Sequence, residues 1–558
     1  MQKHGILPIV KLVTHVVDVT QKYAVFIQPT ALIKAKMKRR KKMNELLRNL
    51  KEVSNKTLTQ NGAVTYASTM TKLYDMFAQA ASMRGAQDDA CVLMFKNAYE
   101  ENPTMALKCL FYLRDIRGGQ GERRFFRLAI KWLAMRHKDE MEHLIKYVPE
   151  YGRYDDLFEL FGTPLEGEMM GYIKYVIDKN EDHLVYKWMP SINTSSRNTQ
   201  ERGRKFAREF GMTEKEYRKM LSWGRKACNL VETLMSQHRW NEIEFNKLPS
   251  RAGLLYSKAF ARREETAARY AAFMSSEKTK VNAGTLYPYD VVAKAVEVMG
   301  CNDYWSRSRG VPLNDTNRLA ANKYWENLTD YFNGATLNAL CVCDTSGSMT
   351  SGYNSKIAPI DVAIALALYT AERAKGPFQN HFISFSSRPK LIETVGVDFC
   401  DKVKRIYEQN LCENTNIEAT FDLILRIAEE NCLSQADLPQ NIIIVSDMQF
   451  DSARGYYSYR GNGSETATLM ENIARKWRAA GYKMPHLIFW NVNAATGAGN
   501  IPMKDEDGVT YVSGASPSIF TSIMTGKTGQ DLMYEALLAP RYEPIHSIYK
   551  TPAVSYEF

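Results

Sequence analysis

The sequence has no uncharged apolar run of about 18 residues, the least that a membrane-spanning helix requires. Residues 5–17 are apolar, but Lys11 interrupts them, Asp18 follows, and no small-residue cleavage site comes after, so we expect no signal peptide. Cysteine is sparse as well, with nine residues, an odd number, and no Cys-x-x-Cys pair. These absences argue against a membrane partner and a disulfide scaffold, and they favour reduced thiols in a cytoplasmic protein.

Motifs that would indicate an enzyme are also missing. The sequence has no Gly-x-Ser-x-Gly, no His-Glu-x-x-His, and no pairing among its nine histidines that fits metal ligands. Residues 525–528, Thr-Gly-Lys-Thr, match the end of a phosphate-binding loop, but Thr521 stands where its first glycine is required. We therefore expect a protein without catalytic residues.

What the sequence has in excess is positive charge, and this charge is unevenly spread. The 558 residues are 45% hydrophobic and 24% charged, as in ordinary globular proteins, with a net charge of +11. Residues 1–42 contain ten basic residues and one acid, a net +9, whereas residues 43–330 have 44 and 37, a net +7. Residues 331–558 have 19 and 24, a net −5. The chain thus divides by charge into a basic leader, a mildly basic body and an acidic C-terminal part.

The leader ends in the run Lys-Arg-Arg-Lys-Lys, residues 38–42, directly before Met43. Three interpretations are open: a nucleic-acid-binding arm, a solvated charge run, or a translated ribosome-binding site, since purine-only codons encode Lys and Arg. In the third case Met43 is the true start and residues 1–42 are not part of the protein. Intact mass or N-terminal sequencing distinguishes these cases.

Two hydrophobic patterns follow the leader. From 68 to 330 apolar residues recur at helical spacing with short connectors, which favours stacked helical pairs in a HEAT-like repeat body; one such helix begins at Asn102-Pro103. After 335, strand-length runs at 337–343, 381–385, 440–445 and 486–490 alternate with amphipathic helices at 359–374, 417–430 and 467–480. This alternation predicts a doubly wound, Rossmann-like α/β domain. We assign 43–334 to an all-α domain, 335–545 to the α/β domain and 546–558 to a C-terminal tail.

The first predicted strand of the α/β domain ends in Asp344-Thr-Ser346-Gly-Ser348. Alternate residues of an extended segment point the same way, so one carboxylate and two hydroxyls converge above the strand. Asp447 follows a later strand at the same edge of the sheet, and Thr415 precedes a helix between them. Hard oxygen ligands of this kind suit Mg²⁺ or another divalent cation. The alternative is a loop that merely caps the next helix.

The set Asp-x-Ser-x-Ser, then Thr, then Asp after an apolar strand resembles the metal-ion-dependent adhesion site (MIDAS) of von Willebrand factor A domains, over about residues 335–545. The resemblance implies that Asp344, Ser346, Ser348 and Thr415 coordinate Mg²⁺ directly or through water. It implies that Asp447 does so mostly through water, which leaves one position open for an acidic or phosphate oxygen of a partner.

Basic residues concentrate between 197 and 226, where ten of them stand against four acids, a net +6. A loop rich in Ser, Thr and Asn begins this stretch, and Trp188, Tyr217 and Trp223 lie nearby for stacking on bases. A solvated helix face over a core of aromatics is the alternative. The candidate RNA contacts are Arg197, Arg202, Arg204, Lys205, Arg208, Lys215, Arg218, Lys219, Arg225 and Lys226.

A second candidate anion site is the glycine-rich segment 117–124, Arg-Gly-Gly-Gln-Gly-Glu-Arg-Arg. Glycines that open a helix flanked by Arg117, Arg123 and Arg124 can hold an anion, such as an RNA phosphate, through backbone amides. A plain turn between two helices is the alternative.

A helical-repeat body followed by an A-type domain is the layout of the Ro autoantigen (TROVE-module) family. Residues 113–123, 151–156 and 249–252, with Ala259-Phe260, resemble segments of Ro-related proteins, and they are closer still to an uncharacterised branch of A-domain proteins related to that family. The resemblance implies a ring of helices that binds misfolded non-coding RNA and small structured RNAs. Individual RNA contacts do not map from the family onto this chain.

The leading hypothesis is therefore a non-enzymatic RNA-binding protein, part of a ribonucleoprotein, with helical repeats that bind structured or misfolded non-coding RNA. Its Mg²⁺-dependent A domain would dock a partner. Two alternatives are open: a protein-interaction scaffold whose metal grips an acidic side chain of a partner, and a partner subunit of a AAA+ ATPase.

Overall fold

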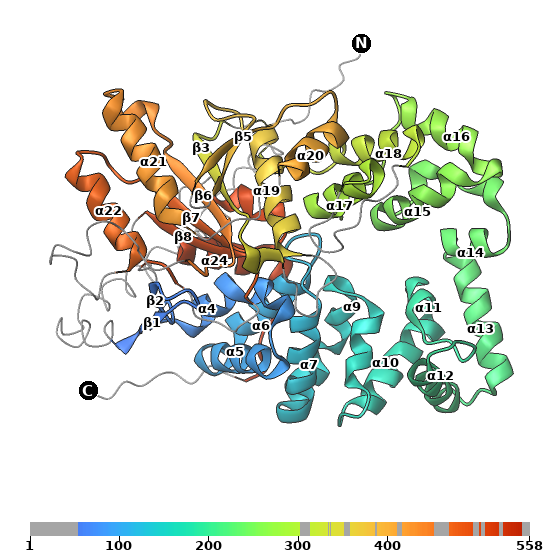
Figure 1. Cartoon of the computed structure of the whole chain (residues 1–558). Coiled ribbons are helices and arrows are strands. Elements are labelled where there is room, and N and C mark those ends of the chain that lie inside the picture. Colours follow the sequence, from blue (N-terminus) through green and yellow to red (C-terminus); the bar gives the residue numbers. More distant parts are fainter. Residues whose placement is uncertain are drawn as a thin grey trace, which may run out of the picture. The chain divides into compact units, whose positions relative to one another are not determined.

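Short helices follow one another through the first part of the chain (Figure 1). The computed structural model describes residues 54–301, 313–332, 334, 336–350, 358–385, 388–409, 416–450, 468–494, 501–503, 508–523 and 528–549. The chain divides into two units, Met1–Lys56 and Thr57–Phe558, and the description below concerns the second. A two-stranded hairpin, β1 Lys56–Leu58 and β2 Val64–Tyr66, precedes the helices, and only its first residue belongs to the first unit. The helical body comprises α4 Lys72–Gln79, α5 Asp88–Glu101, α6 Pro103–Arg114, α7 Arg124–Arg136, α8 Lys138–Leu144, α9 Val148–Tyr151, α10 Glu166–Lys179, α11 Leu184–Trp188, α12 Arg197–Glu209, α13 Glu214–Ala227, α14 Val231–Ser236, α15 Ser250–Arg262, α16 Glu264–Ser275, α17 Pro288–Met299 and α18 Asp315–Glu326.

Local sequence explains where these helices start. Asn102 caps α6 by accepting a hydrogen bond from the Met105 amide at 3.1 Å, and Pro103 occupies the first helical turn. The helix predicted to begin at Asn102-Pro103 is therefore confirmed. Thr213 and Glu216 form a reciprocal capping box at the start of α13.

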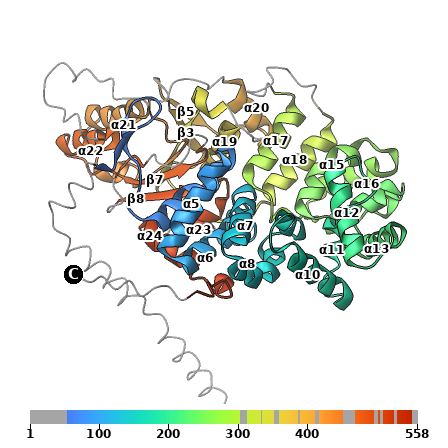
Figure 2. The ribbon, with the colours of Figure 1, turned by 90° about the horizontal axis from the view of Figure 1, so that it is seen from below.

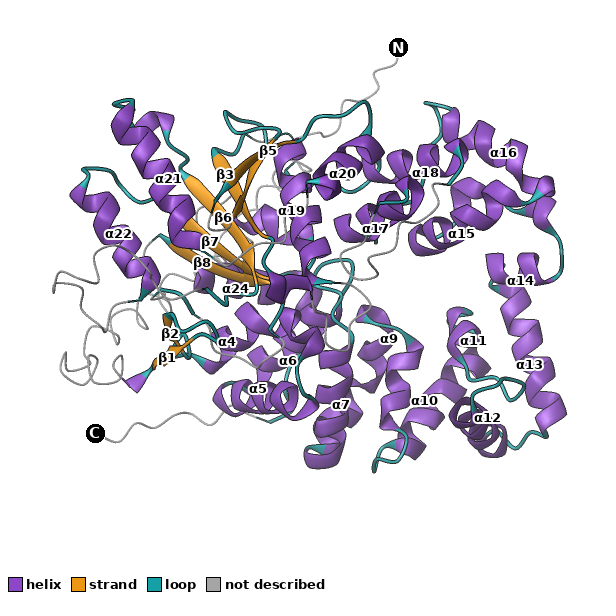
Figure 3. Ribbon diagram, viewed as in Figure 1, coloured by secondary structure: helices purple, strands orange, loops and turns teal. Residues whose placement is uncertain are grey.

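A six-stranded mixed sheet forms the C-terminal part (Figure 3). Its strand order is β5-β4-β3-β6-β7-β8, and every neighbouring pair is parallel except β4 and β5. The order therefore reverses between β3 and β6, as it does in doubly wound sheets. The elements are β3 Ala339–Asp344, α19 Pro359–Arg373, β4 His381–Phe385, β5 Lys390–Glu393, α20 Phe399–Glu408, α21 Ile417–Glu430, β6 Asn441–Ser446, α22 Leu469–Ala479, β7 His486–Asn491, β8 Val509–Ser513, α23 Phe520–Ile523 and α24 Gly529–Leu537.

This arrangement confirms the predicted order of a helical body followed by an α/β part. The four predicted strands and three predicted helices of the C-terminal part all form, with boundaries shifted by at most two residues. Strands β5 and β8 were not predicted. Within the described ranges, no helix is long and apolar enough to span a membrane.

Two hydrophobic clusters join the helical body to the two faces of the sheet. Ile442 and Ile444 on one face share a cluster with helices between residues 63 and 221, together with α21 and α22. Ile443 and Val445 on the other face share a cluster with the helices between 231 and 332, together with α19 and α20. Figure 1 shows α21 and α22 on one side of the sheet and α19 on the other. Because strand residues alternate in direction, one apolar strand serves both clusters.

The C-terminal segment also binds the helical body. Helix α24 lies beside α6 (Figure 2). Beyond it, Arg541 pairs with the buried Asp115, and Ile548 donates its amide proton to Glu140 of α8 at 3.1 Å. The helical body and the C-terminal part thus share ion pairs as well as hydrophobic clusters.

Candidate functional site

The polar residues predicted to bind metal lie where the strand order reverses. Strands β3 and β6 are parallel neighbours with Cys343 opposite Val445, so their C-terminal ends meet at one edge of the sheet. Asp344 ends β3 and Asp447 directly follows β6. Both carboxylates are buried, with exposed fractions of 0% and 4%. This reversal point is where open α/β sheets bind ligands.

Hydrogen bonds fix the first carboxylate and the two serines. The Ser346 amide donates to Asp344 Oδ1 at 2.9 Å, and Ser446 Oγ donates to Asp344 Oδ2 at 2.5 Å. The hydroxyl oxygens of Ser346 and Ser348 lie 3.0 Å apart. The loop after β3 therefore holds both serine hydroxyls close together beside the strand end.

The surroundings of the second carboxylate, Asp447, shift its pKa. Burial and the negative charge of Asp344 raise the pKa of Asp447 to about 7, although the Gln449 amide, which donates to Asp447 Oδ1 at 3.1 Å, partly opposes this rise. Two negative charges that approach each other in a buried site favour a positive ion between them.

Four of the five predicted metal ligands thus lie at one edge of the sheet. Thr415, the fifth, lies outside the described residues. The part of the chain that the structure describes has no group of three or more His, Cys, Asp or Glu side chains suited to a metal. Metal binding at this edge would therefore depend on two carboxylates and serine hydroxyls.

The N-terminal hairpin contacts the loop that follows Asp447. Thr59 donates its hydroxyl proton to the Phe450 carbonyl at 2.8 Å, and the side-chain amide of Asn61 donates to the Gln449 carbonyl at 2.6 Å. These contacts hold the loop after Asp447 against a segment nearly 400 residues away in sequence. Sequence periodicity gives no signal for such a contact.

The basic stretch 197–226 forms α12 and α13, and its cations fall into two groups. Five of them form ion pairs or hydrogen bonds or lie over an aromatic ring. Three of these form ion pairs on the surface: Arg197 with Glu201, Arg204 with Glu214 and Lys205 with Glu166. Arg202 lies over the Phe161 ring at 5.2 Å, and Arg225 donates to the carbonyls of Tyr186 and Met189 and to the Ser191 hydroxyl. Arg225 therefore supports the preceding loop.

The second group projects into solvent. Arg208, Lys215, Lys219 and Lys226 are exposed and form no ion pair with any described residue, and the exposed Arg218 donates only to the Glu214 carbonyl. Lys215, Lys219 and Lys226 recur at helical spacing along one side of α13. We call these three residues the α13 lysine face.

Of the three aromatic residues predicted to stack on bases, one is accessible. Trp223 is 58% exposed, whereas Tyr217 is fully buried and donates its hydroxyl proton to the Pro190 carbonyl. Trp188 is partly covered by the Arg153 guanidinium, 4.2 Å from its ring centroid. Of these three residues, only Trp223 therefore has an exposed ring, and it lies on the same helix as the α13 lysine face.

The glycine-rich turn uses its backbone amides for folding. Gln120 and Gly121 donate to the carbonyls of Tyr112 and Asp115, both at 3.1 Å. A Cβ on Gly119 would lie 1.9 Å from the Tyr112 carbonyl oxygen, and the Tyr287 hydroxyl donates to the Gln120 carbonyl at 2.8 Å. These contacts favour the alternative, a turn that joins α6, α7 and α17.

The flanking arginines of this turn differ in their surroundings. Arg123 pairs with Asp155 at 3.2 Å, and Arg124 pairs with Asp88. Arg117 is exposed. Only Arg117 of these three candidates therefore presents a guanidinium without an ion pair to any residue in the described ranges.

An arginine–aspartate cluster links residues 113–123 with residues 151–156. Asp156, fully buried, accepts from Arg114 at 2.7 Å and from Arg127 at 2.6 Å. Arg153 pairs with Asp155 at 3.2 Å. The charges at these positions are visible in the sequence, but their pairing depends on the packing of α6 and α7 against the turn at 154–160.

Comparisons with known proteins cover both parts of the chain. Residues 59–205 and 187–334 match a family described as Domain of unknown function (DUF2828), and residues 338–538 match Domain of unknown function (DUF7788). Uncharacterized protein L728 of Acanthamoeba polyphaga mimivirus is 26% identical over 534 residues, 85% of this chain and 86% of that protein.

Among solved structures, the Deinococcus radiodurans RO (RSR) protein is similar to 82% of this chain, over 100% of its own length, with a TM-score of 0.44 and 12% identity. At these values the likeness is a coarse one, and the resemblance to Ro-related proteins beyond it stays a prediction.

Proposed function

We propose that this chain is a non-enzymatic RNA-binding protein whose C-terminal sheet is an A-type domain with a divalent-cation site. The main support is the placement of Asp344 and Asp447, two buried carboxylates from adjacent parallel strands, at the reversal of strand order. Ser346 and Ser348 add hydroxyl oxygens at the same strand end. No catalytic role is assigned to any of these groups.

The donor set fits Mg²⁺. Carboxylate and hydroxyl oxygens are hard ligands, and a divalent ion would offset the repulsion that raises the pKa of Asp447. Asp344, Ser346, Ser348 and Asp447 would hold the ion, together with Thr415 by the family resemblance. The bound ion would supply a positive charge that attracts an acidic or phosphate oxygen of a partner.

The α13 lysine face supports RNA as the ligand of the helical body. Its three ammonium groups, with Arg208 on α12, are exposed and form no ion pair with any described acidic side chain. Phosphate contacts of this kind provide most of the affinity for nucleic acid, and exposed Trp223 offers a stacking surface.

Filter binding of structured RNA across a salt series tests the RNA proposal. A variant with Lys215→Ala, Lys219→Ala and Lys226→Ala should bind more weakly. The slope of log K against log salt should flatten by about 2 to 3, because each lost phosphate contact releases roughly one counterion fewer.

A matched control replaces three exposed lysines elsewhere, Lys131→Ala, Lys179→Ala and Lys483→Ala, with the same loss of charge. This control should keep the wild-type slope. No binding of RNA by the wild-type protein at low salt would refute the RNA proposal. So would equal slopes in the two variants.

A protein-interaction scaffold is the second candidate. Leu391 on edge strand β5 is 63% exposed, and Val397 just beyond it is 90% exposed. Exposed apolar side chains next to a strand edge favour contact with protein. A cation-dependent protein ligand together with absent RNA binding would establish this candidate in place of the first.

A further inference from the structure

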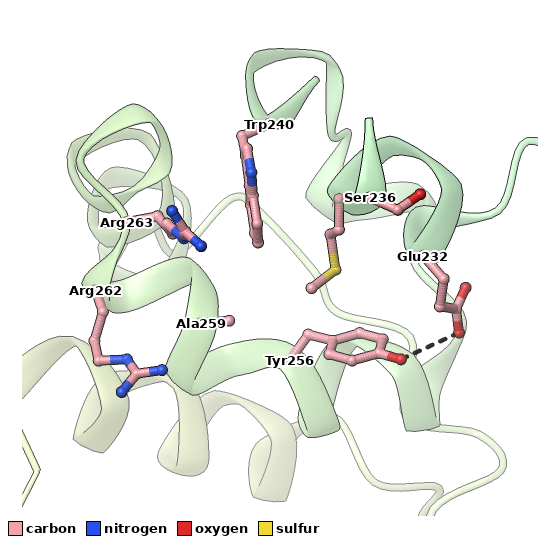
Figure 4. Close-up of a pocket in the computed structure, with 8 residues that line it drawn as sticks. Glu232, Ser236, Trp240, Tyr256, Ala259, Arg262 and Arg263 are labelled. Carbon is pink, nitrogen blue, oxygen red and sulfur yellow. Dashed lines mark hydrogen bonds between the residues drawn. The ribbon is translucent and has the colours of Figure 1, made fainter. Parts of the chain in front are cut away.

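A cavity of about 650 Å³ lies in the helical body between α14, the turn Trp240–Glu242 and α15 (Figure 4). Its volume is within the range of small-molecule sites. None of the sites predicted from the sequence includes it. Its lining residues are Glu232, Met235, Ser236, Trp240, Tyr256, Ala259, Arg262 and Arg263.

Two arginines supply positive charge to one side of the cavity. Arg262 and Arg263 are exposed, and neither guanidinium forms an ion pair or hydrogen bond with another residue that the structure describes. The Arg263 guanidinium lies 4.9 Å from the centroid of the Trp240 ring, which restricts its motion. Two adjacent guanidinium groups without an acidic partner suit a phosphate group.

The Trp240 side chain leaves a buried donor without an acceptor. Trp240 is only 4% exposed, yet its indole Nε1 has no hydrogen-bond partner among the described atoms. A buried donor of this kind costs folding free energy unless a ligand or water accepts its proton. This donor is enclosed by protein atoms, so Trp240 contributes its aromatic ring to the cavity, beside the Arg263 guanidinium, and not its Nε1.

The opposite side of the cavity is aromatic and polar. The Tyr256 hydroxyl donates to Glu232 Oε1 at 3.4 Å (Figure 4), and Met235 also lines the cavity. The ring of Tyr256 and the thioether of Met235 offer surfaces to a planar group, and Glu232 offers an acceptor to its amino groups.

We propose that this cavity binds a single nucleotide. Its phosphate would lie against Arg262 and Arg263, and its base would contact Tyr256 and Met235. A planar ring joined to a phosphate matches both sides of the cavity, whereas a phosphorylated serine would leave the aromatic side unused.

The proposal rests on the RNA-binding function where it takes an RNA strand as one of the two sources of the nucleotide. Helix α14 begins at Val231, shortly after α13 ends at Ala227, so the cavity follows the α13 lysine face along the chain. A strand of RNA on that face could place one unstacked nucleotide in the cavity. A free nucleoside monophosphate has the same chemistry.

Fluorescence anisotropy with a labelled nucleoside 5′-monophosphate tests the site on the full-length protein. Arg262→Ala and Arg263→Ala should each weaken binding about tenfold, because each loses a charge-assisted contact to phosphate. Arg478→Ala, an exposed arginine of α22, is the matched control and should bind as the wild type does.

Competition identifies the source of the nucleotide. Displacement of the label by a short single-stranded oligoribonucleotide places an RNA strand in the cavity, and failure to displace it leaves a free nucleotide as the ligand. Equal affinity in the wild type and both arginine variants would overturn the site, and so would tighter binding of a phosphoserine peptide than of the nucleotide. Because no structured RNA is present in this assay, its failure leaves the salt-slope result for the α13 lysine face intact.

Discussion

Among single residues, Asp156 is a buried carboxylate that pairs with two arginines of the helical body, Arg114 and Arg127. Burial alone would raise the pKa of its carboxyl group, but Arg114 and Arg127 outweigh burial and hold that pKa below its ordinary value. Gly152 makes room for this carboxylate, because a Cβ there would lie 2.6 Å from Asp156 Oδ2. The conformation of residues 151–156 is therefore explained by charge pairing, and an RNA contact is not needed to account for it.

Replacing Asp156 with Ala should destabilise the protein by about 3–5 kcal/mol, because Arg114 would remain buried without its counter-charge. Urea unfolding followed by circular dichroism measures the change. Asp178→Ala is the control, since its pair with Lys174 is exposed and should contribute at most about 1 kcal/mol. Equal effects of the two substitutions would contradict this account of the cluster.

The same carboxyl group predicts an acid dependence. Because the folded-state pKa of Asp156 is lowered, its contribution to stability is present above the unfolded-state pKa of about 4 and is lost as pH falls through the folded value. The difference in unfolding free energy between the wild type and Asp156→Asn should therefore be constant from pH 5 to 7 and shrink below about pH 4. A difference that grows on acidification would refute the pairing.

Among the secondary-structure elements, the hydrophobic pattern of the sequence predicted the strands that are long and buried. Strands β3, β6 and β7 were recognisable because they are continuous apolar runs in the middle of a parallel sheet. Strand β5 was missed because it has four residues and only Ile392 is buried, so its conformation depends on pairing with β4. Strand β8, Val-Thr-Tyr-Val-Ser between two glycines, contains β-branched and aromatic residues from which a strand is predictable.

The turn between α6 and α7 shows where local motif reasoning fails. Its glycines suggested an anion site, yet Gly119 packs against the Tyr112 carbonyl and Gly121 has a positive φ of 62° beside the Tyr287 hydroxyl. Only the packing of distant elements reveals this role. The candidate metal residues, in contrast, follow directly from where two strands end, which sequence can predict.

Gly119→Ala should prevent normal packing of this turn and lower the melting temperature sharply, because its Cβ would overlap backbone atoms that cannot move independently. Gly171→Ala in the middle of α10 is the matched control. No atom lies within 4 Å of that Cβ, and alanine should stabilise the helix by about 0.5–1 kcal/mol. Thermal melts compare the two, and a neutral Gly119→Ala would contradict the packing role.

In the whole molecule, the two hydrophobic clusters make the helical body and the sheet mutually dependent. Each cluster contains residues of the helical body and residues of one sheet face. The hairpin contacts at Gln449 and Phe450 and the Arg541–Asp115 pair add connections across the same boundary.

Calorimetry of the full chain should therefore show one cooperative unfolding transition for the helical body and the sheet together. Its calorimetric and van't Hoff enthalpies should agree. Two separated transitions, one removed by Gly119→Ala and the other unaffected, would show that the two parts unfold independently and would contradict shared clusters.

The central claim is that the ends of β3 and β6 form a divalent-cation site, and Mg²⁺ titration followed by thermal unfolding tests it most directly. For the wild type the melting temperature should rise and saturate, with a gain of about 2.7 kcal/mol when Mg²⁺ is at a hundred times its dissociation constant. Glu429→Gln, an exposed control on α21, should respond equally. Asp344→Asn should show no Mg²⁺-dependent rise, whereas a rise equal to that of the wild type would show that the cation binds elsewhere.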